Sequence, residues 1–167
     1  PFMEELSLDL GGTTGTLGIE DTPKNFKTNQ FHFAPVICYE SVYGDFVAEQ
    51  SKKGAEAIFI ITNDGWWGDT PGYKQHMSFA RLRAIENRKS VARSANTGTS
   101  CFINQRGDVL QKTDWWVATS IRETIKLNRE TTFYSLQGDG LGRVFAFTSA
   151  ILLLFAFVKK FKPTSLK

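Results

Sequence analysis

Two apolar runs separated by one short amphipathic segment constrain the fold of this chain more than any other feature. The first run, FHFAPVIC, covers residues 31–38, and the second, AEAIFIIT, covers residues 55–62. Both are bounded by polar residues, as buried strands are. Residues 45–53, between them, are typical of a short helix that begins at an acid and ends before Gly54. Strand, helix and strand within about 30 residues predict a right-handed parallel crossover and an α/β fold.

A parallel crossover brings the carboxyl ends of its strands to one edge of the sheet, where such folds bind ligands. Cys38 and residues 63–64 are therefore expected to lie together. Cys38 leads directly into the turn of residues 39–41, a position that suits a nucleophile whose following backbone N–H is an oxyanion donor. A single cysteine in a strand is more often an inert core residue, and the pattern alone leaves that alternative open.

The other segments up to residue 140 are expected to complete the same domain. Residues 73–89 predict a long helix with Met77, Ala80, Ala84 and Ile85 at core spacing. The remaining predictions are an extended N-terminal stretch over residues 1–30, a loop at 65–72, strands at 90–95, 100–104 and 108–111, turns at 96–98 and 105–107, and an edge strand at 121–127.

The distribution of charge argues against a nucleic-acid partner. Five of the 20 basic residues lie beyond Asp139, where no acidic residue occurs. Residues 1–140 therefore carry 15 basic and 17 acidic side chains, a net charge of about −2. A nucleic-acid surface would need a basic face on this domain.

The remaining polar residues predict no metal site. His32 and His76 are far apart in the sequence and have no other candidate ligands beside them. The two cysteines, Cys38 and Cys101, are treated as free thiols, although a single bridge is not excluded, and Cys101 is expected to be inert core. A buried structural network is expected from five polar residues: Arg83, Glu86, Asn87, Arg93 and Asn96.

The C-terminal tail differs in kind from the rest. Residues 144–158 contain no charge and only two polar side chains. As a helix they cover about 22 Å, short of the ~30 Å hydrocarbon core of a membrane. A buried core helix is the alternative, but flanking apolar residues and snorkelling basic side chains extend the segment to a transmembrane helix over residues 141–161. Residues 162–167 are then a basic cytoplasmic tail, with residues 1–140 on the opposite side of the membrane.

Four ordered segments resemble the signatures of the nitrilase superfamily of carbon–nitrogen hydrolases. They are VICYE at 36–40, TNDGWWG at 62–68, QHMSFARLRAIENRKSVARSANTG at 75–98 and INQRGDV at 103–109. The opening PFMEE, the WWG loop and the C-terminal apolar segment resemble the apolipoprotein N-acyltransferase branch in particular. The resemblance covers nearly the whole chain.

This resemblance implies an α-β-β-α sandwich, of which the chain is the C-terminal part, with a Glu, Lys and Cys triad. Cys38 matches the cysteine, and the N–H of Tyr39 would serve the oxyanion hole. Glu4 matches a glutamate near the active site, and Glu40 matches the acid that closes the cysteine motif, although a solvated loop acid and a structural ion pair are the simpler alternatives. The triad Glu and Lys are expected upstream of Pro1, so the chain alone is expected to be inactive.

The implied reaction is N-acyl transfer without a cofactor in a bacterial inner membrane. An acyl chain would pass from a phospholipid through a Cys38 thioester to the diacylglyceryl-cysteine amine of an apolipoprotein. Trp66 and Trp67 are expected to contact the acyl chain or the lipid interface, with packing as the alternative. A membrane-anchored nitrilase or amidase and a non-catalytic scaffold on the same fold remain alternatives.

Overall fold

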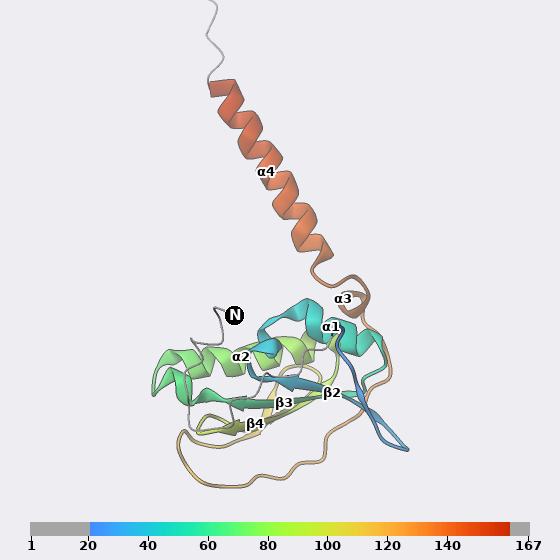
Figure 1. Cartoon of the computed structure of the whole chain (residues 1–167), viewed down its shortest axis with the longest axis vertical. Helices are drawn as coiled ribbons and strands as arrows, with labels where there is room; N and C mark the ends of the chain where they lie inside the picture. Colours follow the sequence, from blue (N-terminus) through green and yellow to red (C-terminus); the bar gives the residue numbers. More distant parts are fainter. Residues whose placement is uncertain (1–20, 161–167) are drawn as a thin grey trace, which may run out of the picture.

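The computed structural model describes residues 21–160, which form one mixed sheet with helices on one of its faces (Figure 1). The strands are β1 (Phe26–Lys27), β2 (His32–Ile37), β3 (Ala57–Asn63), β4 (Ser90–Asn96), β5 (Cys101–Ile103) and β6 (Val109–Lys112), and they lie in the sheet in chain order. Strands β2, β3 and β4 are parallel, whereas β1, β5 and β6 join antiparallel. The parallel pairing of β2 with β3 confirms the expected crossover.

The parallel strands are connected by helices of the expected kind. The helical elements are η1 (Cys38–Val42), α1 (Gly44–Lys52), η2 (Asp64–Trp67), α2 (Pro71–Asn87), α3 (Phe133–Gln137) and α4 (Gly140–Lys160), with η denoting 3₁₀ turns. Helix α2 begins two residues earlier than predicted because Thr70 caps it, accepting a hydrogen bond from Gly72 N at 3.3 Å. Pro71 then occupies the first turn, where its missing N–H costs nothing.

The hydrophobic core lies between the sheet and helices α1 and α2. Its buried members are Ala34, Val36, Val47, Ala55, Ile58, Ile60, Ala80, Ala84, Val91, Cys101 and Ile103. Met77 packs against this cluster, as its spacing predicted. The prediction for Ile85 was wrong, since its side chain is 44% exposed. The buried stripe of α2 instead includes His76, Arg83 and Asn87.

The opposite face of the sheet has no helical layer within residues 21–160. Phe33 and Phe59 stack on this face with ring centroids 4.5 Å apart, and Ile61 is 58% exposed. Residues 113–131 run beneath it without forming a helix or a strand (Figure 1). A hollow of about 380 Å³ lies between the sheet and residues 119–121. The described residues thus hold one helical layer and one sheet, which is half of the expected sandwich.

The edge strand predicted at residues 121–127 is absent from the described structure, although its side chains do alternate in exposure. Carbonyl groups in this segment and just after it accept hydrogen bonds from side chains. Ser90 Oγ donates to Lys126 O at 2.8 Å, and the buried Lys89 Nζ donates to Asn128 O at 2.6 Å and Glu130 O at 2.7 Å. Residues 113–131, which include this segment, therefore form a strap that Lys89 and Ser90 hold through side-chain hydrogen bonds.

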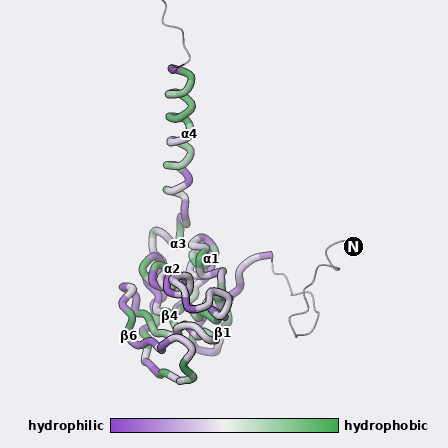
Figure 2. Tube along the Cα trace, turned by 90° about the vertical axis from the view of Figure 1, so that its left-hand side faces the viewer, coloured by the Kyte–Doolittle hydropathy of each residue, from purple (hydrophilic) through white to green (hydrophobic). Residues whose placement is uncertain are grey.

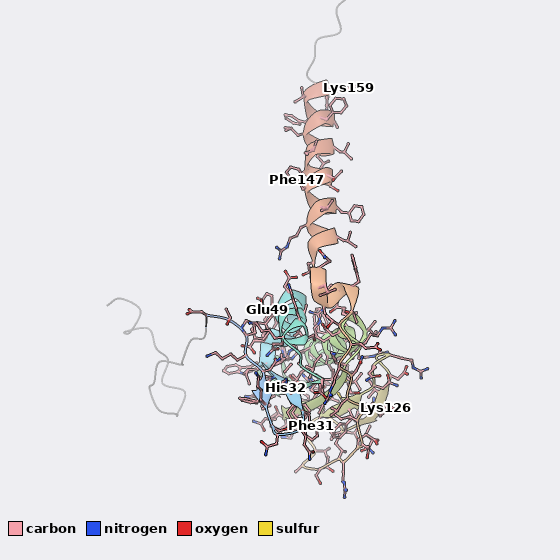
Figure 3. The ribbon with its side chains drawn as sticks, turned by 90° about the vertical axis from the view of Figure 1, so that its right-hand side faces the viewer. Phe31, His32, Glu49, Lys126, Phe147 and Lys159 are labelled. Carbon is pink, nitrogen blue, oxygen red and sulfur yellow. The ribbon has the colours of Figure 1, made fainter. Side chains whose placement is uncertain are left out.

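Helix α4 projects from the domain, and no residue in it is buried. Its 21 residues span about 32 Å at 1.5 Å each. Figure 2 shows its apolar character along almost the whole length, and Figure 3 shows Phe147 and Lys159 standing clear of the domain. Within residues 21–160 it is the one helix long and apolar enough to cross a membrane. The proposed cytoplasmic tail, residues 162–167, lies outside the described residues.

The base of α4 is attached to α1. Asp45 accepts a hydrogen bond from Asp139 N at 2.7 Å through one carboxylate oxygen and pairs with Arg143 through the other. Tyr134 of α3 donates to Asp139 Oδ1 at 2.6 Å. The short helix α3, which the sequence did not predict, is thus part of the joint between domain and helix.

Candidate active site

Cys38 lies where β2 ends and η1 begins, in a backbone conformation that residues other than glycine rarely adopt. Its φ is 51°, in the left-handed region, which costs a residue with a Cβ about 1–2 kcal/mol. Local hydrogen bonds maintain the turn: Ser41 Oγ donates to Cys38 O at 2.9 Å, and Ile37 N donates to Glu40 Oε2 at 2.6 Å. The thiol is partly exposed at the sheet edge. Such a sharp turn is typical of a nucleophile.

The end of β3 lies beside this turn, as the parallel register requires. Ile37 is paired with Ile61, so the next residue of β3 reaches the cysteine. The Oγ1 atom of Thr62 is 3.2 Å from Cys38 Sγ and 3.2 Å from Asp64 Oδ1. The hydroxyl has one proton, which it can donate to a Cys38 thiolate. When Cys38 is a thiol, Thr62 can donate to Asp64 instead and accept from the thiol.

Asp64 is fully buried and is the centre of a polar cluster behind the thiol. Arg93 Nη2, from β4, donates to both carboxylate oxygens, at 2.9 and 2.8 Å. His76 Nδ1, from α2, lies 3.0 Å from Oδ1. Burial alone would raise the pKa of Asp64, but the hydrogen bond with His76 and the charge of Arg93 outweigh it and hold the pKa below its ordinary value. The carboxylate is therefore ionised.

His76 joins this cluster to the nucleophile turn. Its Nε2 lies 3.2 Å from Cys38 O and 3.1 Å from Ser41 Oγ, and its side chain is 2% exposed. The prediction from the sequence concerned only a metal site and did not include these contacts of His76. Asp64 and Cys38 are 12 and 38 residues from it, and only the fold of α2 against the sheet edge brings them together.

The other three residues expected to act with Cys38 differ in their surroundings. Tyr39 is half exposed, with its ring 5.9 Å from that of Tyr43. Glu40 binds the backbone of its own turn through Ile37 N, which explains an acid at this position without a basic partner. Glu4 lies outside the described residues.

The two tryptophans of η2 occupy different environments. Trp66 is 71% exposed, whereas Trp67 is 39% exposed and its ring centroid is 6.5 Å from that of His76. A small hollow of about 160 Å³ beside the turn is lined by Tyr39, Val42, Trp67, Gly72, Gln75, His76 and Phe79. Trp67 is thus part of the site's immediate wall, and Trp66 faces outward.

Cys101 has no such environment. It is fully buried at the start of β5, and burial, partly offset by the charge of Arg93, raises the pKa of its thiol to about 11. The expectation of an inert core cysteine is consistent with this position, because the reactive species is the thiolate.

The expected network of Arg83, Glu86, Asn87, Arg93 and Asn96 is divided between two places. Arg83 pairs with Glu86 at 2.9 Å, and Asn87 Nδ2 donates to Arg83 O at 3.0 Å, all within α2. Arg93 belongs to the cluster behind Cys38 instead, and Asn96 is exposed.

The chain is similar to known proteins over most of its length. Residues 9–133 match the family model described as carbon-nitrogen hydrolase. The chain is 34% identical over 164 residues to apolipoprotein N-acyltransferase of Chlorobaculum tepidum, covering 96% of this chain and 31% of the relative. It is 32% identical over 177 residues to the enzyme of that name from Wigglesworthia glossinidia brevipalpis, covering 100% of this chain and 35% of the relative. The chain thus spans about a third of the length of these relatives.

Solved structures show the same fold. A carbon-nitrogen hydrolase from Helicobacter pylori superposes with a TM-score of 0.52 at 14% identity, covering 58% of this chain and 41% of that one. A branch 10 nitrilase-superfamily member from Saccharomyces cerevisiae gives a TM-score of 0.51 at 20% identity, covering 60% and 40%. The nitrilase-like fold and the resemblance to apolipoprotein N-acyltransferases are confirmed, and the chain belongs to the carbon–nitrogen hydrolase family.

Proposed function

We propose that the full-length protein is an apolipoprotein N-acyltransferase with Cys38 as its nucleophile. The observation that carries the proposal is the left-handed turn at the carboxyl edge of β2, which exposes the thiol beside the Thr62 hydroxyl. Relatives named apolipoprotein N-acyltransferase align with 96% and 100% of the chain. In the proposed reaction, an acyl group passes from a phospholipid to a diacylglyceryl-cysteine amine.

The reaction divides into two balanced steps. In the first, a base takes the proton of the Cys38 thiol, the thiolate attacks the ester carbonyl of the phospholipid, and a C–S bond forms. The C–O bond breaks, and the glycerol oxygen takes that proton from the base and leaves as a lysophospholipid. In the second, the acceptor amine attacks the thioester, a C–N bond forms, and the C–S bond breaks to restore the thiolate. The amine loses its proton to a base. A thioester suits this role because it reacts readily with amines.

The residues around Cys38 have separate parts in this proposal. The N–H of Tyr39 donates to the oxyanion of each tetrahedral intermediate. Glu40 keeps the turn closed, and Glu4 acts near the site as the resemblance implies. Trp67 lines the small hollow beside the turn, and the exposed Trp66 contacts lipid at the interface. No cofactor takes part.

The membrane location rests on α4. A helix of 21 residues with a mean hydropathy of 2.1 over its most apolar window is long enough to cross a bilayer. Lys159 and Lys160 lie at the end of this helix. By the positive-inside rule, these two basic residues indicate a cytoplasmic C-terminus. Residues 1–140 then lie on the extracytoplasmic side of a bacterial inner membrane, where diacylglyceryl apolipoproteins are modified.

The test is to trap the acyl-enzyme in the full-length protein. Purified in detergent and mixed with bacterial phospholipids but no acceptor, it should gain one acyl mass on the peptide containing Cys38. Neutral hydroxylamine should release that mass, since thioesters are cleaved there more readily than esters or amides. Cys38→Ala should abolish both adduct and turnover, whereas the matched variant Cys101→Ala should keep them. An adduct on Cys101, or full transfer by Cys38→Ala, would refute the proposal.

The family match favours a second candidate, a membrane-anchored nitrilase or amidase that hydrolyses C–N bonds. It uses the same thiol but passes the acyl group to water. Adding a diacylglyceryl-cysteine peptide to the acylated protein separates the two. An acyltransferase converts the peptide to its N-acyl form, while a hydrolase releases free acid at a rate that the peptide does not change.

A further inference from the structure

The cluster behind Cys38 converges on one backbone carbonyl. Cys38 O lies 2.9 Å from Ser41 Oγ, which donates to it, and 3.2 Å from His76 Nε2. A carbonyl oxygen has two lone pairs, so it can accept from both donors at once. The two contacts come from different elements, η1 and α2, and both side chains are buried.

The position of the His76 ring is fixed from its other side. Nδ1 lies 3.0 Å from Asp64 Oδ1, and Asp64 is in turn held by Arg93. Carboxylate and carbonyl oxygens only accept hydrogen bonds, so the ring is the donor wherever it bonds Asp64 through Nδ1 or Cys38 O through Nε2. A continuous chain of contacts therefore leads from Arg93 on β4 to the carbonyl of the nucleophile.

That carbonyl shares a peptide plane with the expected oxyanion donor. The C=O of Cys38 and the N–H of Tyr39 belong to one trans peptide, so they point in opposite directions. A donor that fixes the direction of the oxygen fixes the direction of the N–H as well. Hydrogen bonds to the oxygen also polarise the amide and strengthen its N–H as a donor.

We propose that His76 is a positioning residue for acyl transfer, which holds the Cys38–Tyr39 peptide so that Tyr39 N–H is aimed at the oxyanion. The inference rests on the proposed function, in which Cys38 attacks an acyl carbonyl. His76 does not touch the acyl group: its side chain is 2% exposed, and both ring nitrogens face protein atoms. Its effect passes entirely through the peptide.

Two substitutions divide the contacts of the ring between them. The amide nitrogen of glutamine reaches the place of Nε2, so His76→Gln retains a donor to Cys38 O. The amide nitrogen of asparagine reaches the place of Nδ1, so His76→Asn retains the contact with Asp64 and loses the one with Cys38 O. Ser41→Ala removes the second donor to the same carbonyl and changes the side-chain volume less than His76→Asn does. It replaces His76→Asn in the test if that variant does not fold.

Two reactions of Cys38 in the full-length protein provide the readout. Acylation by phospholipid forms an oxyanion, whereas alkylation by iodoacetamide displaces iodide and forms none. His76→Asn should acylate about 10²-fold more slowly than wild type, within the range seen when an oxyanion donor is lost. Its alkylation rate and its KM for phospholipid should change less than about threefold. His76→Gln should recover acylation to within about tenfold of wild type, and Ser41→Ala should follow His76→Asn.

The outcomes separate this inference from the proposed function. If the wild-type protein forms no thioester on Cys38, the proposed function fails. If the wild type acylates and His76→Asn acylates equally fast, the positioning role fails alone. Equal losses of acylation and alkylation would show that His76 is merely structural. The same conclusion would follow if His76→Gln acylated no faster than His76→Asn.

Discussion

The hydroxyl of Thr62 lies 3.2 Å from the sulfur of Cys38, although 24 residues separate them in the chain. The contact exists because β2 and β3 are parallel and end together. The Thr62 hydroxyl can donate to the sulfur, so it is placed to act on the reactions of Cys38. The sheet register thus contributes directly to the chemistry at its edge.

Replacing this hydroxyl should slow every reaction of Cys38 that requires the thiolate. Thr62→Val keeps the branched shape and removes the donor, so iodoacetamide alkylation at neutral pH should slow by about tenfold, as expected for one charged hydrogen bond of about 1.5 kcal/mol. Thr62→Ser keeps the hydroxyl and is the matched control. Equal alkylation rates in the valine variant and the wild type would contradict this role.

The ionised Asp64 should make stability depend on acid. Its pKa in the folded protein is below the ordinary value of 3.8, so its contribution is complete above about pH 4 and is lost as the pH falls through the lowered value. The thermal midpoint of wild type should therefore fall below pH 4 more steeply than that of Asp64→Asn. The exposed Asp114→Asn should keep the wild-type slope.

At neutral pH the same variant should be strongly destabilised. Asp64→Asn leaves the Arg93 guanidinium buried without its carboxylate, which costs about 3–5 kcal/mol when one partner of a buried pair is removed. The measurement is the thermal midpoint in detergent at pH 7. A midpoint within a degree of wild type would show that the pair contributes little.

The strap of residues 113–131 should depend on Lys89. Lys89→Met removes the donor to Asn128 O and Glu130 O, at a cost of about 2 kcal/mol for acceptors left without partners. Limited proteolysis should then cut the strap faster than in wild type. Lys126→Met, which alters an exposed side chain of the same strap, is the control and should be cut at the wild-type rate.

The proposed orientation of α4 should be visible by chemical labelling. A cysteine at Asp139 should react with a membrane-impermeant maleimide added outside spheroplasts, and a cysteine at Lys167 should react only after the membrane is opened. Labelling of both positions from the same side would exclude a span between them. The experiment uses a Cys101→Ala background and subtracts the signal of Cys38.

Local sequence patterns predicted the nucleophile turn well because the relevant interactions are themselves local. An apolar run ends at Cys38, and the turn is closed by Ser41 and Glu40 within three residues. The meeting of Cys38 with Thr62 and Asp64 also follows from parallel pairing of two strands that the sequence indicates. Such inferences need only strand ends and one crossover.

His76 was missed because its partners come from three other segments of the chain. One signal was available: residues 76, 80, 83, 84 and 87 repeat at helical spacing and form the buried stripe of α2. Polar side chains on a stripe otherwise made of alanine require buried partners. Looking for those partners at the nearby strand ends would have led to Asp64.

Edge pairing failed as a prediction for a different reason. The alternation of apolar and polar residues in 121–127 indicates which side chains are more exposed. It does not indicate which groups form hydrogen bonds with the backbone. Side-chain donors at Lys89 and Ser90 take carbonyls of this strap, and neither residue reveals that role by its position in the sequence.

Asp45, seven residues after Cys38, binds the base of α4. A helix of fixed apolar length tilts to match the thickness of the bilayer around it. Because the joint at Asp45 joins α4 to α1, such a tilt would be passed to the segment that follows Cys38. If α4 crosses the membrane as proposed, reconstitution into lipids with shorter or longer acyl chains should change the height of the thiol above the headgroups. Lipid thickness would then act on the rate of the proposed reaction independently of which acyl chain is transferred.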